Sequence, residues 1–451
     1  MKLTFWNGVD TVGGVQVLAS GERGSLIFDL GVVRNPYIAP RRALFNDFVR
    51  PRPDSVLADY LRAGMAPRLE GLFDSRYGDG STDPAVLYSA LTADLPLVGT
   101  ASVGRVAVYV SHLHDDHMAL LPFVAPEIPV YMSETGRSLH RAMTEAGELQ
   151  PVEAPITGIG VNETFEVEDL EVEVVPIDHD IIGAAGIIVR SGRATIAYTG
   201  DWRRHGTSPH VVDAFADRCR EVGVDALLTE ASTAGPSPRP SIGEGELVER
   251  LDKLVTAATG GLVWVSFYRR HLERVAAIAE IARGAGRKLA VSERTATLLT
   301  HVAEVGLLGS DVLSGLVVYV GQAPPSVPTV TVGEIQAARD EFLLEIEPST
   351  WPLLLDVGVE ADDVYVHVNG APFGRTDPTW PVLETWLGQL GISHEVLDSH
   401  GHASPADLEW LADRIEPGCV IPVHTNHPTH FPGGRHRVVL PQRGGKIEVV
   451  S

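Results

Sequence analysis

The sequence predicts an α/β fold in which one unit is inserted into another. From about residue 241, apolar runs of strand length alternate with helical segments, which is typical of a doubly wound α/β unit. The apolar runs before residue 241 follow another pattern, in which each run is followed by a histidine or an acidic residue. The clearest case is the apolar run 106–110, which leads directly into residues 111–117, a stretch with three histidines and two aspartates.

The first part of the chain predicts a β-rich layer. Residues 3–30 contain short alternating runs separated by turn residues, so we expect short strands there. Residues 34–104 are irregular and rich in proline, with one helix expected near 55–64. Connections of this length are unusual unless they cover a site, so we interpret this stretch as a lid.

The middle of the chain continues the series of strands that end at polar residues. A helix is expected to begin near His117. The expected strands that follow are 170–175, the hairpin pair 186–190 and 194–198, and 224–229. They lead into Asp178-His179-Asp180, Thr199-Gly200-Asp201 and Glu230, respectively. Because strand ends in one sheet lie close together, these side chains are candidates for a common site.

The second unit is expected between these strands and the end of the chain. Its expected strands are 262–265, 288–291, 316–320 and 364–368, and its expected helices are 272–283, 295–305 and 381–390. After this unit, the sequence again contains candidate site residues. Ser404, Pro405 and Asp407 predict a capped helix start just after His402, and the strand 419–423 ends at His424.

Composition limits the class of protein. The chain of 451 residues is long enough for a full core and for two or three domains. Acidic residues outnumber basic ones by 59 to 36, which argues against indiscriminate binding of polyanions. Cys219 and Cys419 are too few for a disulfide framework. We see neither a membrane span nor a signal peptide, and we therefore expect a cytoplasmic protein.

The histidine run predicts a metal site. Nitrogen and carboxylate ligands without thiolates suit zinc, manganese or a similar ion. We expect one ion at His112, His114 and His179, and a second at Asp116, His117 and His424, with Asp201 bridging them. Two such ions lower the pKa of a water between them and neutralise a displaced oxygen, so the pattern predicts a hydrolase.

Two further residues are candidates for catalysis. Glu230 follows a strand and His402 precedes a helix, and their places in the same series predict that Glu230 orients His402. His402 would then bind the scissile group or protonate the leaving oxygen. Candidate substrate contacts are Ser266, Arg269, Arg270 and Arg203, which lie where a phosphate could bind. Solvent-exposed charges without a role in the site are an equally good interpretation of these four.

The motifs resemble those of the metallo-β-lactamase superfamily. Its His-x-His-x-Asp-His motif is matched by residues 112–117, and its later histidine and aspartate by His179 and Asp201. Residues 227–233, 400–403 and 422–424 resemble the acidic, Ser-Gly-His-Ala and Pro-Val-His motifs of the β-CASP branch. Residues 265–271 resemble the first strand-to-helix element of the β-CASP domain. The landmarks occur in order across nearly the whole chain.

The resemblance implies a metallo-β-lactamase αββα sandwich with an inserted β-CASP-like domain. It divides the chain into a first metallo-β-lactamase part at 1–238, the insert at 239–395 and a returning segment at 396–451. A ribonuclease J-like nuclease is implied, with two divalent ions, Zn²⁺ or Mn²⁺, and single-stranded RNA as substrate. Asp116, Glu230 and His402 would carry the hydrolysis, which leaves a 5′-phosphate. Exonuclease or endonuclease action and a homodimer are left open.

Some positions depart from the ribonuclease J pattern. His400 replaces a serine, Thr425 and Asn426 replace Gly-Glu, and the Gly-Ser-Gln-Gly-Glu-Pro segment is not found. These departures leave the substrate open. One alternative is a hydrolase of a small ester, lactone or thioester on the same fold. Another is a non-catalytic binding protein, which would predict missing ligands, whereas the ligand series here is complete.

Overall fold

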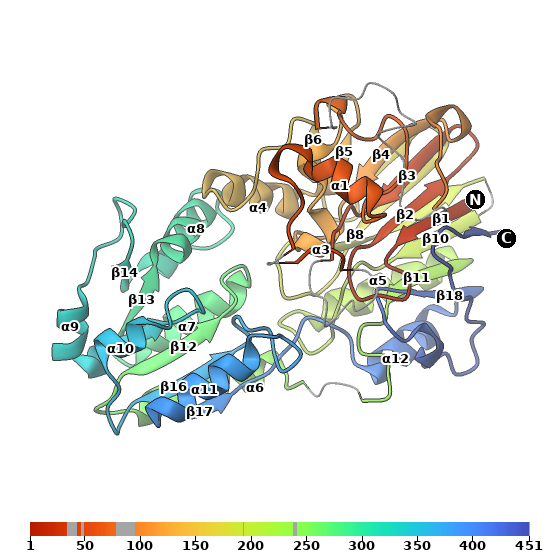
Figure 1. Cartoon of the computed structure of the whole chain (residues 1–451). Coiled ribbons are helices and arrows are strands. Elements are labelled where there is room, and N and C mark those ends of the chain that lie inside the picture. Colours follow the sequence, from red (N-terminus) through yellow and green to blue (C-terminus); the bar gives the residue numbers. More distant parts are fainter. Residues whose placement is uncertain (34–42, 47–48, 78–94, 193, 238–240, 451) are drawn as a thin grey trace.

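The computed structural model describes residues 1–33, 43–46, 49–77, 95–192, 194–237 and 241–450. Within these ranges the chain forms three sheets, of seven, six and six strands. Two of the sheets lie face to face in one lobe, and the third forms the centre of a second lobe (Figure 1). This mixed α/β architecture confirms the predicted fold class.

The first sheet combines strands from the beginning and the end of the described chain. Its order is β19 (Lys446–Glu448), β1 (Lys2–Asn7), β2 (Gln16–Ser20), β3 (Gly24–Phe28), β4 (Arg105–Tyr109), β5 (Val130–Ser133) and β6 (Ile156–Ile159). The strands from β19 to β3 are antiparallel, and those from β3 to β6 are parallel. The parallel half directs the carboxyl ends of β3 and β4 to the same edge of the sheet.

The second sheet carries most of the other strands that end at polar residues. Its order is β18 (Cys419–Val423), β11 (Ala226–Glu230), β10 (Ala194–Tyr198), β9 (Ala185–Ser191), β8 (Leu170–Pro176) and β7 (Thr164–Val167). β10, β11 and β18 are parallel neighbours. The carboxyl ends of these three strands therefore lie side by side, as the sequence predicts.

The two sheets form a sandwich with helices outside. Between the sheets, Phe28 of β3 stacks on Tyr198 of β10 with ring centroids 5.3 Å apart. The outer face of the first sheet is covered by α1 (Val56–Arg62), α3 (Asp115–Met118) and α4 (Glu134–Glu145). The outer face of the second is covered by α5 (Pro209–Val222) and α12 (Pro405–Ile415). The result is the four-layer αββα arrangement.

The third sheet is wholly parallel. Its order is β14 (Leu316–Val320), β13 (Lys288–Ser292), β15 (Phe342–Glu345), β12 (Val263–Phe267), β16 (Val364–Val368) and β17 (Ser393–Val396). α6 (Glu244–Ala257), α7 (Leu272–Gly284) and α8 (Glu293–Glu304) cover one face. α9 (Val332–Ala337), α10 (Leu353–Val357) and α11 (Trp380–Leu390) cover the other. Helices on both faces confirm the doubly wound unit.

The second lobe is inserted between two neighbouring strands of the second sheet. The chain leaves that sheet after β11 and returns through α12 to β18, which pairs with β11. α12 begins with the predicted capping box, in which Ser404 and Asp407 exchange hydrogen bonds. The precise boundaries at 238/239 and 395/396 stay a prediction, and residues 238–240 lie outside the described ranges.

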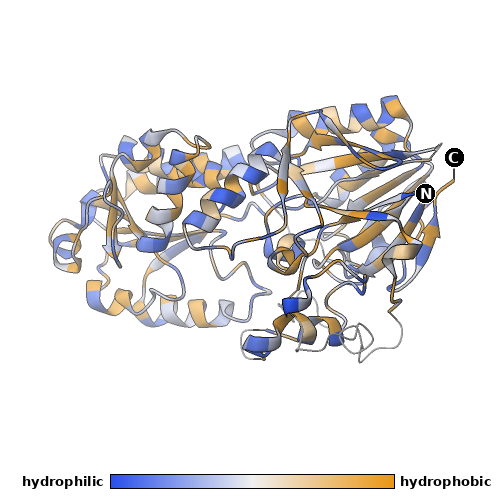
Figure 2. Cartoon of the chain, turned by 90° about the horizontal axis from the view of Figure 1, so that it is seen from above, coloured by the Kyte–Doolittle hydropathy of each residue, from blue (hydrophilic) through white to orange (hydrophobic). Residues whose placement is uncertain are grey.

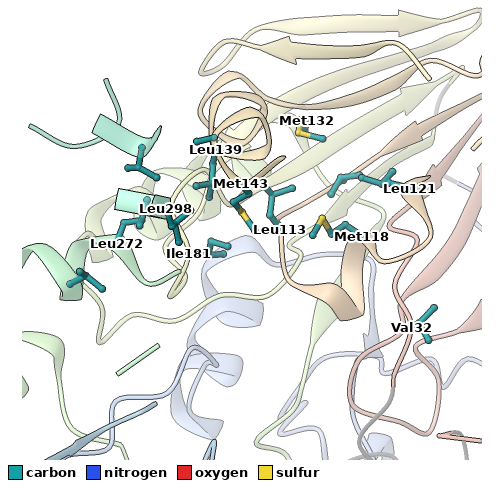
Figure 3. Close-up of a cluster of buried hydrophobic side chains, with 14 of the residues drawn as sticks. Val32, Leu113, Met118, Leu121, Met132, Leu139, Met143, Ile181, Leu272 and Leu298 are labelled. Carbon is teal, nitrogen blue, oxygen red and sulfur yellow. The ribbon is translucent and has the colours of Figure 1, made fainter. Parts of the chain in front are cut away.

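The two lobes share a hydrophobic contact. Leu272 and Leu298 of the insert lie in one buried cluster with Leu139 and Met143 of α4, and with Ile181 (Figure 3). Viewed from above, the two lobes lie side by side, with helices between their sheets (Figure 2). Because apolar surface is removed from water there, this contact holds the insert against the sandwich.

Some expectations need correction. The helix expected from His117 begins at Asp115, so His117 lies inside it. The described parts of the proposed lid include Leu57, Leu61, Leu69 and Leu72, which are core residues rather than a cover. Residues 34–42, 47–48 and 78–94 of that stretch lie outside the described ranges. No helix in the described ranges is long and apolar enough to cross a bilayer, and the cytoplasmic location stays a prediction.

Candidate metal centre

The polar ends of the strands converge on one point between the lobes. His112 follows β4, Asp201 follows β10 and His424 follows β18, and all three side chains are buried. α3 adds Asp116 and His117 from its single turn. With His114 and His179 these make seven candidate ligands, which come from α3 and from the ends of strands in two different sheets. The pattern of strand followed by polar residue predicts this arrangement.

The first group of candidate ligands consists of three histidines. One nitrogen each from His112, His114 and His179 lies within 4.8 Å of the others. The Nε2 atom of His179 is 3.1 Å from Nδ1 of His114. Two ligand nitrogens at about 2.05 Å from a tetrahedral zinc ion are roughly 3.3 Å apart, so this spacing fits a shared cation.

The second group combines histidines with carboxylates. Asp116, His117, Asp201 and His424 each offer an atom within 4.8 Å of the others. Nε2 of His424 is 3.1 Å from Oδ2 of Asp116, and Nε2 of His117 is 3.3 Å from Oδ2 of Asp201. The same Oδ2 of Asp201 lies 3.9 Å from Nε2 of His112, in the first group. Asp201 thus stands between the two groups.

One nitrogen of each of four imidazoles is fixed by an oxygen. Nδ1 of His117 is 2.7 Å from Asp29, and Nδ1 of His179 is 2.7 Å from the carbonyl of Gly401. Nδ1 of His112 is 3.0 Å from the Ser111 hydroxyl, and Nδ1 of His424 is 2.7 Å from the Ser232 hydroxyl. Such contacts orient the ring and direct Nε2 at the centre, as is usual for histidines that bind metals.

Several buried atoms at the centre have no hydrogen-bond partner within the described residues. They are Nε2 of His112, His114 and His117, Oδ1 of Asp180 and Asp201, and Nδ1 of His402. A buried polar atom without a partner costs free energy, so a concentration of such atoms calls for a ligand. Nitrogen and oxygen donors in this number fit two divalent cations.

The local electrostatics favour the metal-binding protonation states of His112, His179 and Asp201. Burial disfavours the imidazolium of His112 and holds its pKa well below the usual range, and it lowers the pKa of His179 to about 4. For Asp201, burial acts in the opposite direction, but His424 and His117 outweigh it and hold the carboxyl pKa well below its usual range. Neutral imidazoles and ionised carboxylates are the forms that bind metal ions. At His117, burial lowers the imidazole pKa, but Asp201 and Asp116 outweigh it and raise the pKa well above its usual range, so this ring has to lose a proton when a metal ion binds.

Asp29 is a buried support that the sequence predictions missed. Its carboxylate accepts hydrogen bonds from the backbone N–H and hydroxyl of Ser111, from the hydroxyl of Tyr198 and from His117. It therefore holds Ser111, Tyr198 and the candidate ligand His117 in place at once. The available signal was its position directly after β3, in the same pattern as the ligands.

A close backbone approach positions α3. The N–H of Leu30 donates to the carbonyl of His117, and a Cβ on Gly31 would lie 1.5 Å from the carbonyl oxygen of Asp116. Only glycine fits at this distance. The loop after β3 therefore fixes the depth at which Asp116 and His117 enter the centre.

Glu230 and His402 lie beside both groups. Nδ1 of His402 is 3.6 Å from Glu230 and 3.6 Å from Asp201, too long for hydrogen bonds but close enough for strong attraction. Glu230 is itself fixed by the backbone N–H groups of Ser232 and Ala403. Burial disfavours the imidazolium, but Glu230 and Asp201 outweigh it and raise the pKa of His402 to about 9.

Asp180 also lies at the centre, although the predicted site residues do not include it. Its Oδ1 is 3.2 Å from Nε2 of His179 and 3.6 Å from Nε2 of His114. A Cβ on Gly401 would come within 2.6 Å of this oxygen. The carboxylate is therefore confined between the first group and the segment that carries His402. A lone acid next to a histidine is too common in sequences to mark such a position.

Two of the four predicted substrate contacts are contradicted. The Arg203 side chain has no exposed surface and pairs with Asp178 and Glu244, so it cannot contact a substrate. Ser266 is 1% exposed, and its hydroxyl donates to the carbonyl of Ala371. Both are structural residues. Burial and pairing were not visible in the sequence, where a polar residue after a strand has the same pattern in either role.

The other two predicted contacts are partly accessible. Arg269 and Arg270 both donate to Glu148, which follows α4, and Arg270 also pairs with Asp115 at 3.3 Å. Their side chains are 16% and 12% exposed. These ion pairs tie the insert to the sandwich beside the metal centre, and a role in substrate binding stays a prediction.

Comparisons with known proteins agree with this architecture. Residues 90–252 match the family described as "Beta-lactamase superfamily domain". Ribonuclease J of Sinorhizobium meliloti is 25% identical over 342 residues, 70% of this chain and 57% of that protein. Ribonuclease J of Pyrococcus abyssi is 25% identical over 344 residues, 71% of this chain and 74% of that protein. The chain thus spans a little under three fifths of the first of these relatives.

A solved structure covers the whole chain. It is the crystal structure of a protein of unknown function from Enterococcus faecalis V583, with a TM-score of 0.78 and 22% identity over 99% of both chains. At this identity the likeness concerns the fold alone. Together with the sandwich, the insert and the matched motifs, these findings show that the chain contains a β-lactamase superfamily domain and is similar to ribonuclease J.

Proposed function

We propose that this protein is a metal-dependent nuclease that hydrolyses phosphodiester bonds in RNA with two bound divalent ions. The observation that carries the proposal is the pair of ligand groups that have Asp201 between them and lie beside Glu230 and His402. The similarity to ribonuclease J over 70% of the chain favours RNA as the substrate. The alternative, a hydrolase of small esters, lactones or thioesters, would use the same ligands.

Zn²⁺ is the first candidate and Mn²⁺ the second, because the donors are imidazoles and carboxylates. Divalent ions held by the two groups would supply an activated water and neutralise charge on the scissile phosphate. The residues that would hold them are His112, His114 and His179 in the first group and Asp116, His117, Asp201 and His424 in the second. Asp29, Ser111, Ser232 and the Gly401 carbonyl keep the rings oriented.

His402 is the proposed proton donor for the leaving oxygen. Its ring lies 5.8 Å from the ring of His179 and 5.5 Å from the ring of His424, so it faces both ligand groups. It is 28% exposed, whereas Glu230 is almost completely buried, so His402 is the member of the pair that a substrate can reach. Glu230 acts as a positioning residue that favours the protonated ring.

The acidic surface makes bound cations important for this function. With a net charge of −23, the molecule as a whole repels an RNA backbone. The centre, with its two bound ions, would be a local exception to that repulsion. Action in the cytoplasm on single-stranded RNA, from an end or internally, remains part of the proposal.

The direct test uses end-labelled single-stranded RNA and DNA, incubated with the purified protein and Mn²⁺, Zn²⁺ or a chelator. We expect cleavage of RNA that the chelator abolishes. Mononucleotide products would indicate an exonuclease and discrete fragments an endonuclease. Absence of cleavage with either metal, together with hydrolysis of a lactone or thioester, would favour the alternative function.

A second test concerns His402. The substitution His402→Ala is expected to lower cleavage by at least about 100-fold, because proton donation in the transition state contributes roughly 10²- to 10⁴-fold. The metal content, measured by mass spectrometry, should stay near that of the wild type. His210→Ala, on the exposed surface of α5, is the matched control and should leave both unchanged. Normal cleavage by the His402→Ala protein would exclude this role.

A further inference from the structure

We propose that Tyr268 and Phe373 form a stacking subsite that binds a nucleobase of the substrate next to the metal centre. The proposal rests on the proposed nuclease function and adds a recognition site to it. Both residues belong to the insert, and the ligand would be a flat, unpaired base rather than a phosphate.

A chain of aromatic contacts leads from the metal centre to the surface. The ring of Tyr268 lies 5.7 Å from the ring of His114, a candidate ligand of the first group. The ring of Phe373 lies 5.4 Å from that of Tyr268, in a T-shaped arrangement with an interplanar angle of 84°. Tyr268 follows β12 and Phe373 lies beyond β16, and these parallel neighbours bring both residues to the same edge of the sheet.

Phe373 is exceptional in its exposure. It is 52% exposed, and no other phenylalanine, tyrosine or tryptophan is exposed in the part of the chain that the structure describes. The other exposed large apolar residues there are leucines and valines, which are ordinary on a protein surface. A phenylalanine with half of its surface in water, two ring contacts from a metal ligand, is placed to offer a ring to a bound molecule.

The loop that carries Phe373 is held in place. The N–H of Phe373 donates to the carboxylate of Asp377, and the hydroxyl of Ser266 donates to the carbonyl of Ala371. A Cβ on Gly370 would lie 2.0 Å from the Ser266 hydroxyl oxygen, so the loop sits directly against β12. A subsite on a fixed loop loses little conformational freedom on binding. This gives Ser266 a supporting role in place of the predicted direct contact.

Stacking also suits the charge of this protein. Binding through phosphates would act against the net charge of −23, whereas base stacking on an aromatic ring does not depend on a positive surface. The cationic residues that follow Tyr268 are Arg269 and Arg270, and both are already paired with acidic side chains. Bases in a duplex stack on one another, so this subsite would select single strands.

The test measures binding in a protein that does not cleave. The His402→Ala protein, loaded with Mn²⁺, is titrated with a fluorescent single-stranded RNA, with and without the second substitution Phe373→Ala. We expect the second substitution to raise the Kd by about 5- to 100-fold, the usual effect of removing one stacked base. Phe373→Trp should restore binding, and its fluorescence should be quenched by the RNA.

Abasic RNA separates stacking from an indirect structural effect. An RNA that lacks the one base that stacks should bind more weakly than intact RNA to the His402→Ala protein, which keeps Phe373. The same RNA should bind no more weakly than intact RNA to the protein that also carries Phe373→Ala. Leu355→Ala, at a leucine that is 64% exposed, is the matched control and should bind like its parent.

The outcomes are distinct. Equal Kd values with and without Phe373, or a Phe373→Ala effect that is the same on abasic RNA, would overturn the stacking subsite and leave the nuclease proposal intact. Failure of the wild type both to bind RNA and to cleave it would overturn the proposed function, and the subsite with it.

Discussion

Two buried polar clusters lie close together in this protein and differ in how their hydrogen bonds are satisfied. At the metal centre, six buried side-chain atoms lack partners within the described residues. At the junction with the insert, Arg274 donates to both oxygens of Glu244 and to the carbonyls of Val368 and Ser399. Arg203 shares Glu244 and is also buried. The side chains of the two clusters are similarly buried. Those at the junction have hydrogen-bond partners, whereas the six atoms at the metal centre have none in the described part of the chain.

The comparison separates a binding site from a structural support. Satisfied buried charges rigidify a junction, whereas unsatisfied ones represent a free-energy cost that a ligand can remove. Removing a member of the metal centre should therefore cost function and little stability. Removing a member of the junction should cost stability first. The following substitutions test this contrast.

The largest effect is expected for Asp201→Asn, because Asp201 lies between both ligand groups. Metal affinity and RNA cleavage should each fall by more than the roughly 10- to 100-fold that loss of an outer partner typically costs. In the metal-free protein, the substitution loses the attraction to His117 and His424, but it also removes a buried charge whose Oδ1 has no partner within the described residues, so the free energy of unfolding should fall by less than in Glu244→Gln. Mass spectrometry and denaturant titration measure the two effects. A strongly destabilised metal-free variant would contradict the contrast.

The junction should respond in the opposite way. Glu244→Gln leaves two buried guanidinium groups without their shared carboxylate, and breaking such a pair typically costs about 3–5 kcal/mol. Denaturant unfolding of the metal-free protein measures this loss. Glu246→Gln is the control on the same helix, because Glu246 is half exposed and pairs with Arg250 on the surface. A loss below about 1 kcal/mol for Glu244→Gln would remove the distinction between the clusters.

The junction should also weaken in acid. Burial raises the pKa of Glu244, but Arg274 outweighs it, and the pKa falls from 4.5 to about 2. The stabilisation is therefore complete above about pH 4.5 and is lost as the pH falls through about 2. The difference corresponds to roughly 3 kcal/mol. The free energy of unfolding is measured as a function of pH for the wild type and for Glu244→Gln. The part of the acid-induced decline that comes from Glu244 should occur only in the wild type. Equal slopes of the free energy against pH in the two proteins would contradict the prediction.

The smallest effect is expected at Asp180. Its carboxylate faces His114 and His179, so Asp180→Asn should lower the affinity of the first group for Mn²⁺ by up to about ten-fold. Equilibrium dialysis measures the affinity without reference to activity. Asp115→Asn is the control, because Asp115 is 59% exposed and pairs with Arg270. The same affinity in both variants would mean that Asp180 contributes nothing to the first group.

The parts of this site that were predictable are those with local patterns. The ligands from His112 to His117 are close in sequence, and Asp201, Glu230 and His424 each follow an apolar strand. The doubly wound unit was predictable from its alternating elements. Its edge strand β17 was not, because all four of its residues are exposed and lack an apolar pattern.

The residues whose roles were predicted wrongly, or were not predicted, owe those roles to partners that are distant in sequence. Arg203 is structural because Glu244 and Asp178 surround it, and Asp29 supports the centre because Tyr198 and Ser111 fold onto it. Phe373 is notable only because Tyr268 and His114 lie behind it. Sequence shows which residue types are present, whereas burial and pairing decide what each of them does.

The order of the ligands along the chain has a consequence for biosynthesis. All three histidines of the first group have been synthesised once residue 179 is added, but His424 comes 308 residues after its neighbour Asp116. The second group is therefore incomplete until the insert has been synthesised and β18 has paired with β11. During translation, the candidate ligands of the first group are thus all present well before any chemistry that needs both groups becomes available.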